Sequence, residues 1–307
     1  MNTTARISAR TMATVQLVPL TPMSQDGKRV EYERLTMFTR DLYDAGIRVF
    51  LPAAGTGEFH SLSAKEVVQC VEATKAGVGP DAVVIAPVGF GLAHALEIGR
   101  GAIENEADGL LVMPPVHPYL CDEGVRDYLL ALAKELPLPM LAYKKGPAPS
   151  DALLLELCKS GKLAGVKYGE NNLDAAAKLI KAVGDAAIVS CGIAERYAAY
   201  FHLAGAVGYT SGAGNLCPRL TLAMHGALVR SDYAEATRLL SILRPIEDYR
   251  ARAGDSFNIS MLKAAMKATG RDFGPARLPQ RPITANEQRE IEALVEPILA
   301  QEGKLAI

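Results

Sequence analysis

The sequence predicts a (β/α)8 barrel with a C-terminal helical extension, an α/β fold. Eight short apolar segments alternate with amphipathic stretches, at a spacing of roughly 20–30 residues. The apolar segments lack strict alternation, as expected for parallel strands that are buried on both faces. The chain has 307 residues, enough for a barrel of about 250 residues and an extension. No glycine-rich fingerprint follows the first segment, which favours the barrel over a doubly wound open sheet.

Most of the expected strands end in proline, glycine or a small polar residue, which suits a turn. The predicted strands are Thr14–Pro22, Arg48–Gly55, Ala82–Gly89, Gly109–Pro115, Pro139–Lys145, Leu163–Gly169, Ala187–Ile193 and Ala206–Gly212. Amphipathic stretches between them predict the helices. One of these stretches begins with Ser63 and has Glu66 three positions later, the spacing of a capping box.

After the eighth unit the chain shows helical patterns and no strand pattern, so we divide it into a barrel (1–230) and an extension (231–307). Within the extension we expect Lys263 and Lys267 to lie on a solvated helix face. We expect residues 1–13, rich in Ser and Thr, to be a flexible lead-in.

Charge and cysteine content exclude several classes of function. The 33 basic and 34 acidic residues give a net charge of −1, which argues against binding to nucleic acid or an anionic membrane. No apolar run is long enough to span a bilayer. The five scattered cysteines and five histidines lack metal-site spacing, so we assign no metal, no cofactor and no disulfide framework. We expect a cytoplasmic protein with a small-molecule partner.

Lys167 is the first candidate for a functional residue, because it interrupts the apolar segment "LAGVKYG". Taken alone, this pattern also fits a strand-end lysine whose ammonium reaches water. In a barrel, however, active sites lie at the C-terminal ends of the strands, and Tyr143 ends the neighbouring segment at a matching depth. A desolvated lysine there can attack a ketone to form a Schiff base, with Tyr143 as a candidate proton carrier.

Four motifs carry a resemblance to a known family: "AGTGE", "LAYKK", "GVKYG" and "GYTSGAGN", on the second, fifth, sixth and eighth strands. Together they resemble the dihydrodipicolinate synthase/N-acetylneuraminate lyase family, over nearly the whole chain. The resemblance implies class I aldolase-type chemistry, a barrel with a helical extension, and a homotetramer or dimer. It implies that Lys167 is the Schiff-base lysine and Tyr143 the proton shuttle. The substrate-binding positions that it implies are Gly55 and Thr56 for the carboxylate, then Gly192 and Thr210, with Ser211 and Asn215 close by.

Three departures from the synthases narrow the expected substrate. Gly55 precedes Thr56 where the synthases have two hydroxyl residues, and Val116 replaces a relay tyrosine. Lys144 and Lys145, but no arginine, follow the strand-five tyrosine. These differences favour the sugar-acid branch, which includes the 5-dehydro-4-deoxyglucarate dehydratases and related keto-deoxy sugar-acid lyases. A replacement of the relay tyrosine by His117 or Tyr119 is left open.

Other interpretations stay open. Within the family, the chain could be a 4-hydroxy-tetrahydrodipicolinate synthase or a pyruvate-dependent aldolase. The glycines of "GYTSGAGN" could hold a phosphorylated metabolite, with Lys167 as an anion clamp. Because Val116 breaks the relay, a non-catalytic 2-oxo-acid-binding protein is a third alternative, although retention of Lys167 and Tyr143 argues against it. We expect Glu58 to brace a loop and Cys191 to be a buried filler.

Overall fold

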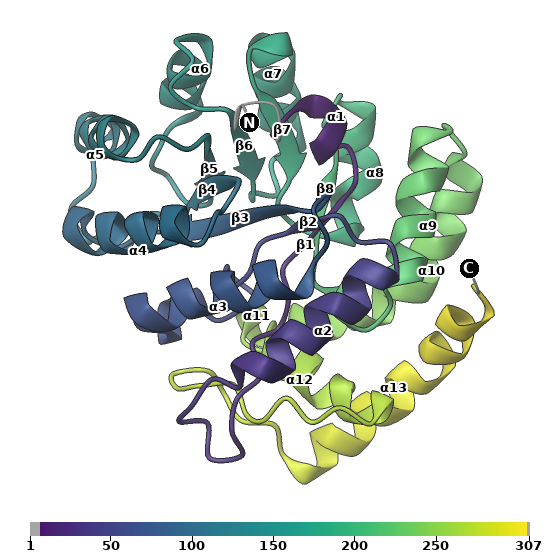
Figure 1. Cartoon of the computed structure of the whole chain (residues 1–307). Coiled ribbons are helices and arrows are strands. Elements are labelled where there is room, and N and C mark those ends of the chain that lie inside the picture. The colour runs from purple at the N-terminus through teal and green to yellow at the C-terminus, as the bar shows by residue number, and fades with distance from the viewer. Residues whose placement is uncertain (1–6, 306–307) are drawn as a thin grey trace.

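A computed structural model describes residues 7–305, which form a closed barrel of eight parallel strands in the order β1 to β8 (Figure 1). The predicted fold class is therefore confirmed. Each strand lies within its predicted segment, and most are shorter because the segment continues into the following loop. The strands are β1 (Val15–Leu17), β2 (Val49–Phe50), β3 (Val83–Val88), β4 (Gly109–Val112), β5 (Met140–Lys144), β6 (Gly165–Tyr168), β7 (Ile188–Cys191) and β8 (Tyr209–Ser211).

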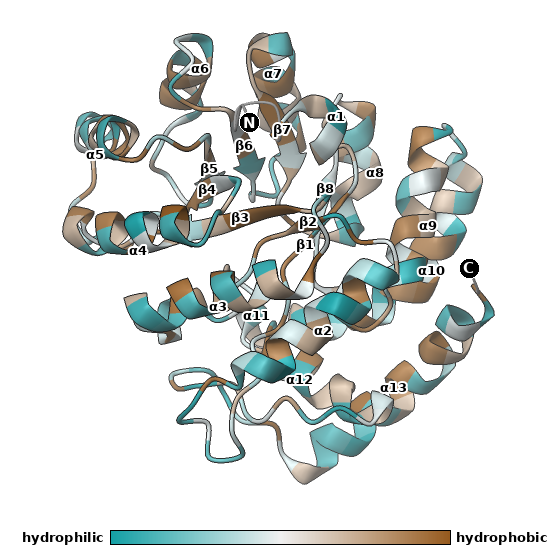
Figure 2. Cartoon of the chain, in the orientation of Figure 1, coloured by the Kyte–Doolittle hydropathy of each residue, from teal (hydrophilic) through white to brown (hydrophobic). Residues whose placement is uncertain are grey.

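Helices surround the strands and cover their outer faces (Figure 1). Figure 2 shows the hydrophobic colouring concentrated on strands such as β3, while the surrounding helices alternate between hydrophobic and hydrophilic faces. The predicted capping box at the start of α3 (Ala64–Gly77) is confirmed: the side chains of Ser63 and Glu66 each accept a hydrogen bond from the other residue's backbone N–H. These helices are α2 (Tyr32–Asp44), α3 (Ala64–Gly77), α4 (Leu92–Glu104), α5 (Asp122–Glu135), α6 (Asp151–Lys159), α7 (Leu173–Val183), α8 (Glu195–Leu203) and α9 (Pro218–Val229).

The N-terminal segment differs from the expected flexible lead-in. Residues 1–6 lie outside the described residues, but Ala9–Met12 form the short helix α1. Met12 is fully buried, and its carbonyl accepts a hydrogen bond of 3.0 Å from the side chain of Gln16. Ile7 packs so closely on Gly109 that a Cβ there would lie 2.1 Å from its Cδ1. The prediction of a flexible lead-in is therefore wrong for residues 9–12, because apolar contacts with the barrel hold this segment in place.

The C-terminal extension is helical, as predicted. Helix α13 (Ala285–Lys304) packs against α9, α10 (Tyr233–Arg250) and α12 (Ser260–Met266) on the outside of the molecule (Figure 1). No helix in residues 7–305 is both long and apolar enough to cross a membrane. The domain boundary at residue 230 stays a prediction. The extension contains α10 (Tyr233–Arg250), α11 (Arg252–Asp255), α12 (Ser260–Met266), the short 3-10 helix η5 (Lys267–Thr269) and α13 (Ala285–Lys304).

The two lysines of α12 and η5 have different environments. Lys267 has a side chain that is 46% exposed, as predicted. The side chain of Lys263 is only 2% exposed and lies 2.5 Å from the Glu58 carboxylate, so the predicted solvated position is wrong for Lys263. All residues of its helix, 260–266, are buried, so this helix has no solvated face.

Candidate active site

Lys167 and Tyr143 lie side by side at the C-terminal ends of adjacent strands. They are register partners across β5 and β6, and the Lys167 Nζ lies 3.8 Å from the centre of the Tyr143 ring. Lys167 is 4% exposed, so its amine is held in the protein rather than in water. This excludes the interpretation of Lys167 as a lysine whose ammonium reaches solvent. The predicted convergence of the two side chains is present in the structure.

Burial changes the protonation of both groups. It lowers the pKa of Lys167 from 10.5 to about 7, with a further lowering by the positive charge of Lys145. The pKa of the Tyr143 phenol is raised to about 12, again mainly by burial. At neutral pH a substantial share of Lys167 is therefore the nucleophilic free amine, while Tyr143 keeps its proton.

Two glycines make room for this pair. A Cβ on Gly169 would lie 2.4 Å from the Tyr143 ring, and a Cβ on Gly192 would lie 3.0 Å from the Lys167 Cγ and 2.8 Å from a backbone carbonyl. Any larger residue at either position would clash with Tyr143, with Lys167 or with the backbone beside them. The predicted role of Gly192 in lining the pocket with its carbonyl stays a prediction, but its small size has this separate structural cause.

The turn after β2 presents Gly55 and Thr56 on the same face of the barrel as Lys167, since the C-terminal ends of all eight strands meet there. Thr56 is buried, and a Cβ on Gly55 would meet nothing within 4 Å. The Glu58 carboxylate accepts a hydrogen bond of 2.7 Å from the backbone N–H of Arg277 and is ion-paired with Lys263. The prediction that Glu58 braces this loop is confirmed.

The side chains at the end of β8 are bonded to the protein. Thr210 Oγ1 donates to the Cys191 carbonyl at 3.3 Å. Ser211 Oγ is hydrogen-bonded to the Glu195 carboxylate and accepts from the backbone N–H of Gly214 at 2.8 Å. The amide of Asn215 bonds the backbone of Leu20 at 2.8 Å and of Val18 and Gly212 at 2.9 Å. These hydrogen bonds hold the β8 loop against the segment that follows β1. Substrate contact by Ser211 and Asn215 stays a prediction.

Comparisons with known proteins agree with this geometry. The sequence profile of the dihydrodipicolinate synthetase family matches residues 11–298. This chain belongs to that family. The chain is 32% identical over 259 residues to a probable 5-dehydro-4-deoxyglucarate dehydratase of Ralstonia nicotianae, covering 83% of each protein. A second probable 5-dehydro-4-deoxyglucarate dehydratase, from Streptomyces coelicolor, is 29% identical over 296 residues and 93% of each chain.

Solved structures of the family have the same fold. The dihydrodipicolinate synthase of Oceanobacillus iheyensis superposes with a TM-score of 0.90 at 30% identity, over 94% of this chain and 97% of that one. The sialic acid aldolase of Ruminococcus gnavus, at 19% identity and a TM-score of 0.86, covers 95% of this chain and 98% of its own and shares the fold. Family membership makes this chain an enzyme of the lyase or aldolase type.

The loop after β4 contains Val116, the expected position of the relay tyrosine, and is exposed. Val116 is 64% and Tyr119 87% exposed, and the exposed His117 accepts a hydrogen bond of 3.1 Å from the Tyr119 backbone N–H. In the single chain none of these three side chains is buried with Lys167. Replacement of the relay tyrosine by His117 or Tyr119 stays a prediction.

Several buried polar residues were not identified from the sequence. The Gln16 amide donates to Ser190 Oγ at 2.7 Å across the barrel interior, and Ser190 is the β7 register partner of Lys167. Glu195 is buried and accepts from Thr221 Oγ1 at 3.0 Å; burial and the charge of Glu247 raise its pKa to about 7. The only sequence signal was a polar residue within or directly after an apolar strand. The predicted filler role of Cys191 agrees with its full burial, which raises its thiol pKa to about 12.

Proposed function

We propose that this chain is a Schiff-base-forming lyase that dehydrates a 2-keto-3-deoxy sugar acid such as 5-dehydro-4-deoxyglucarate. The observation that carries the proposal is the buried Lys167 amine over the Tyr143 ring, with a pKa lowered to about 7. A lysine in this state reacts with ketones at neutral pH, whereas an anion clamp would require a permanently charged ammonium. The names of the Ralstonia and Streptomyces relatives support the choice of substrate.

The reaction that we assign begins with addition of the Lys167 amine to the keto carbon, and loss of one water molecule then gives the imine. Loss of a proton from the adjacent carbon gives an enamine, whose electron pair expels the next carbon's hydroxyl group as water. We assign Tyr143 to move these protons: it gives its own to the hydroxyl group lost as the imine forms, and the resulting phenolate takes the proton from the adjacent carbon. Tyr143 then gives that proton to the leaving hydroxyl group and regains one from the water that hydrolyses the imine. Hydrolysis of the imine then releases the unsaturated product and restores the amine.

The other site residues divide into two groups in this proposal. Gly55 and Thr56 bind the substrate carboxylate through backbone N–H groups and a hydroxyl, and Gly192 and Thr210 line the pocket. Ser211 and Asn215 are the candidates for binding the substrate's hydroxyl groups, and their hydrogen bonds within the protein hold the β8 loop in place. The steps that we assign need neither a metal nor a cofactor. Cytoplasmic location and assembly as a homotetramer or dimer stay predictions.

Borohydride trapping tests the proposal. The enzyme is incubated with pyruvate or with a panel of 2-keto-3-deoxy sugar acids, reduced, and analysed by intact mass and peptide mapping. We expect one added 2-oxo acid per chain, on the peptide that contains Lys167. If the reduced protein gains no mass with any 2-oxo acid, the imine mechanism is wrong, and a non-catalytic 2-oxo-acid-binding protein becomes the better interpretation.

A further inference from the structure

The turn after β2, residues 51–61, is held in a conformation that it would not adopt alone. Ala53 has φ 54° and Glu58 has φ 71°, so two residues that are not glycine lie in the left-handed region. Such conformations persist where the surrounding structure imposes them, and they are frequent at binding sites. Gly55 and Thr56 lie between these two residues. The position of their N–H groups therefore depends on what holds Ala53 and Glu58.

Part of the support comes from the barrel itself. The hydroxyl group of Thr21 donates to the Gly57 carbonyl at 2.7 Å. A Cβ on Gly57 would lie 2.8 Å from the backbone of Ala53, so the turn folds back on itself with no space for a side chain. These contacts hold the middle of the turn, and the backbone of Glu58 is hydrogen-bonded to Gly55 at 3.2 Å and Ser61 at 2.8 Å within it. The Glu58 side chain is left to be held by another element.

That element is the C-terminal extension. One carboxylate oxygen of Glu58 lies 2.5 Å from Nζ of Lys263 on α12, and the other accepts from the backbone N–H of Arg277 at 2.7 Å. Lys263 also donates to the Pro275 carbonyl at 3.1 Å. The side chains of Glu58 and Lys263 are 0% and 2% exposed, so water cannot replace either partner.

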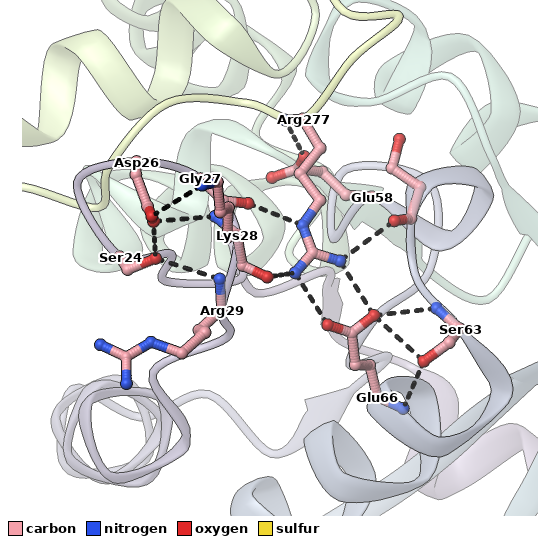
Figure 3. A network of polar contacts seen from close by, with 10 residues as sticks. Ser24, Asp26, Gly27, Lys28, Arg29, Glu58, Ser63, Glu66 and Arg277 are labelled. Atoms are coloured by element: carbon pink, nitrogen blue, oxygen red, sulfur yellow. Dashed lines mark hydrogen bonds and ion pairs between the residues drawn. The ribbon is translucent and has the colours of Figure 1, made fainter.

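The guanidinium group of Arg277 forms hydrogen bonds with several surrounding loops (Figure 3). It donates to the backbone carbonyls of Gly27 at 2.9 Å, Lys28 at 2.6 Å and Ser61 at 3.2 Å. It also forms two hydrogen bonds, of 2.9 and 2.7 Å, with the carboxylate of Glu66 at the start of α3. Arg277 thus connects the end of the turn, the loop near residue 27 and the first turn of α3.

We propose that Lys263 and Arg277 are positioning residues for the substrate, which hold the Gly55–Thr56 turn in its carboxylate-binding conformation through Glu58. The inference rests on the proposed function, because it assigns that turn to the carboxylate of a 2-oxo acid. Lys263 has a second effect, which is electrostatic. Glu58 follows Gly55 closely in the chain, and an unneutralised carboxylate there would repel an incoming substrate anion. The C-terminal extension thereby becomes part of the substrate site.

Steady-state kinetics and pyruvate trapping of three variants test this inference. Lys263→Met leaves the charge of Glu58 unneutralised, so we expect a rise of about tenfold in KM and in the pyruvate concentration for half-maximal trapping, with kcat changed by less than about threefold. The double variant Lys263→Met/Glu58→Gln removes that charge and keeps an acceptor for the Arg277 N–H. We expect it to recover most of the lost affinity. Arg281→Met, which breaks the ion pair of the same extension with Glu287, is the matched control and should keep the wild-type KM.

If Lys263→Met is not recovered folded, Arg277→Met provides the same test. It keeps the backbone N–H donor to Glu58, loses the guanidinium contacts, and should raise KM about fivefold. A wild-type KM in folded Lys263→Met or Arg277→Met would overturn the inference, as would an equal rise in Arg281→Met. The inference would also be overturned if the double variant Lys263→Met/Glu58→Gln kept the raised KM of Lys263→Met. These results differ from failure of the proposed function, in which the wild-type protein itself forms no adduct with pyruvate.

Discussion

The Glu58 carboxylate and the Lys263 ammonium form a fully buried ion pair 2.5 Å apart, between the turn after β2 and the helix α12. Burial lowers the pKa of Lys263, and the charge of Glu58 opposes this shift. Because each group is desolvated, the pair matters most when one partner is removed: the remaining charge then has neither water nor a counter-ion. The contact therefore links the stability of the extension to the geometry of the site.

Removal of the Lys263 charge alone should destabilise the folded protein. We expect Lys263→Met to lower the free energy of unfolding by about 3–5 kcal/mol, since it leaves a buried carboxylate unpaired. The double variant Lys263→Met/Glu58→Gln should lose less than about half of this. Lys267→Met, which breaks an exposed pair with Asp272, is the matched control and should change stability by less than about 1 kcal/mol. Urea unfolding measures all three, and equal losses for Lys263→Met and Lys267→Met would contradict the buried pair.

Lys167→Arg tests the nucleophile. Arginine keeps the positive charge but stays protonated at accessible pH, so it cannot attack a ketone. The variant should fold and lose essentially all adduct formation with pyruvate and borohydride. Adduct formation at the wild-type level would identify a different lysine as the nucleophile.

The lowered pKa of Lys167 predicts how imine formation depends on pH. The observed rate with pyruvate should rise with pH up to about 7 and level off above it, because only the neutral amine reacts. Lys145→Met removes a cation that lowers this pKa, so the midpoint should move to higher pH. Single-turnover trapping over a pH series measures both midpoints. Lys159→Met, on the exposed end of α6, should keep the wild-type midpoint, and a fall in the midpoint of Lys145→Met would contradict the assigned environment.

The same pKa predicts a gain in stability when the lysine is lost. In the unfolded chain Lys167 binds its proton up to about pH 10.5, whereas in the folded chain it releases it above about pH 7. The unfolded state therefore binds more protons between these values, and the stability of the wild-type protein rises with pH there. Lys167→Met should be more stable than wild type by roughly 2–4 kcal/mol at pH 7, and the difference should shrink toward pH 10. Urea unfolding at pH 7 and 9.5 measures this change, and a difference that grows with pH would exclude a lowered pKa.

Substrate choice is the last prediction. Val116 and the absence of a strand-five arginine argue against aspartate semialdehyde as the second substrate. A site that bonds substrate hydroxyl groups discriminates against analogues without them, because its polar groups are then left unpaired. We expect kcat/KM for five- or six-carbon 2-keto-3-deoxy acids to exceed that for pyruvate plus aspartate semialdehyde by at least about a hundredfold. Similar or higher efficiency with the semialdehyde would make the protein a synthase.

The sequence by itself determined the positions of the strands and helices and the placement of Lys167 beside Tyr143. Strand and helix positions follow from local patterns, namely apolar runs and the capping box of Ser63 and Glu66, which need no knowledge of distant residues. The barrel closure then places the ends of consecutive strands together, so that Tyr143 and Lys167 become neighbours as predicted.

Only the tertiary structure decided which polar side chains are free. Lys263 has the spacing of an exposed helical lysine, yet it is buried because Glu58 and Pro275, far away in the chain, provide its partners. Asn215 follows a glycine-rich loop that suits a ligand, yet its amide bonds backbone groups of the loop after β1. A side chain's hydrogen-bond partners depend on which distant segments pack against it, and one sequence without structure does not specify those contacts.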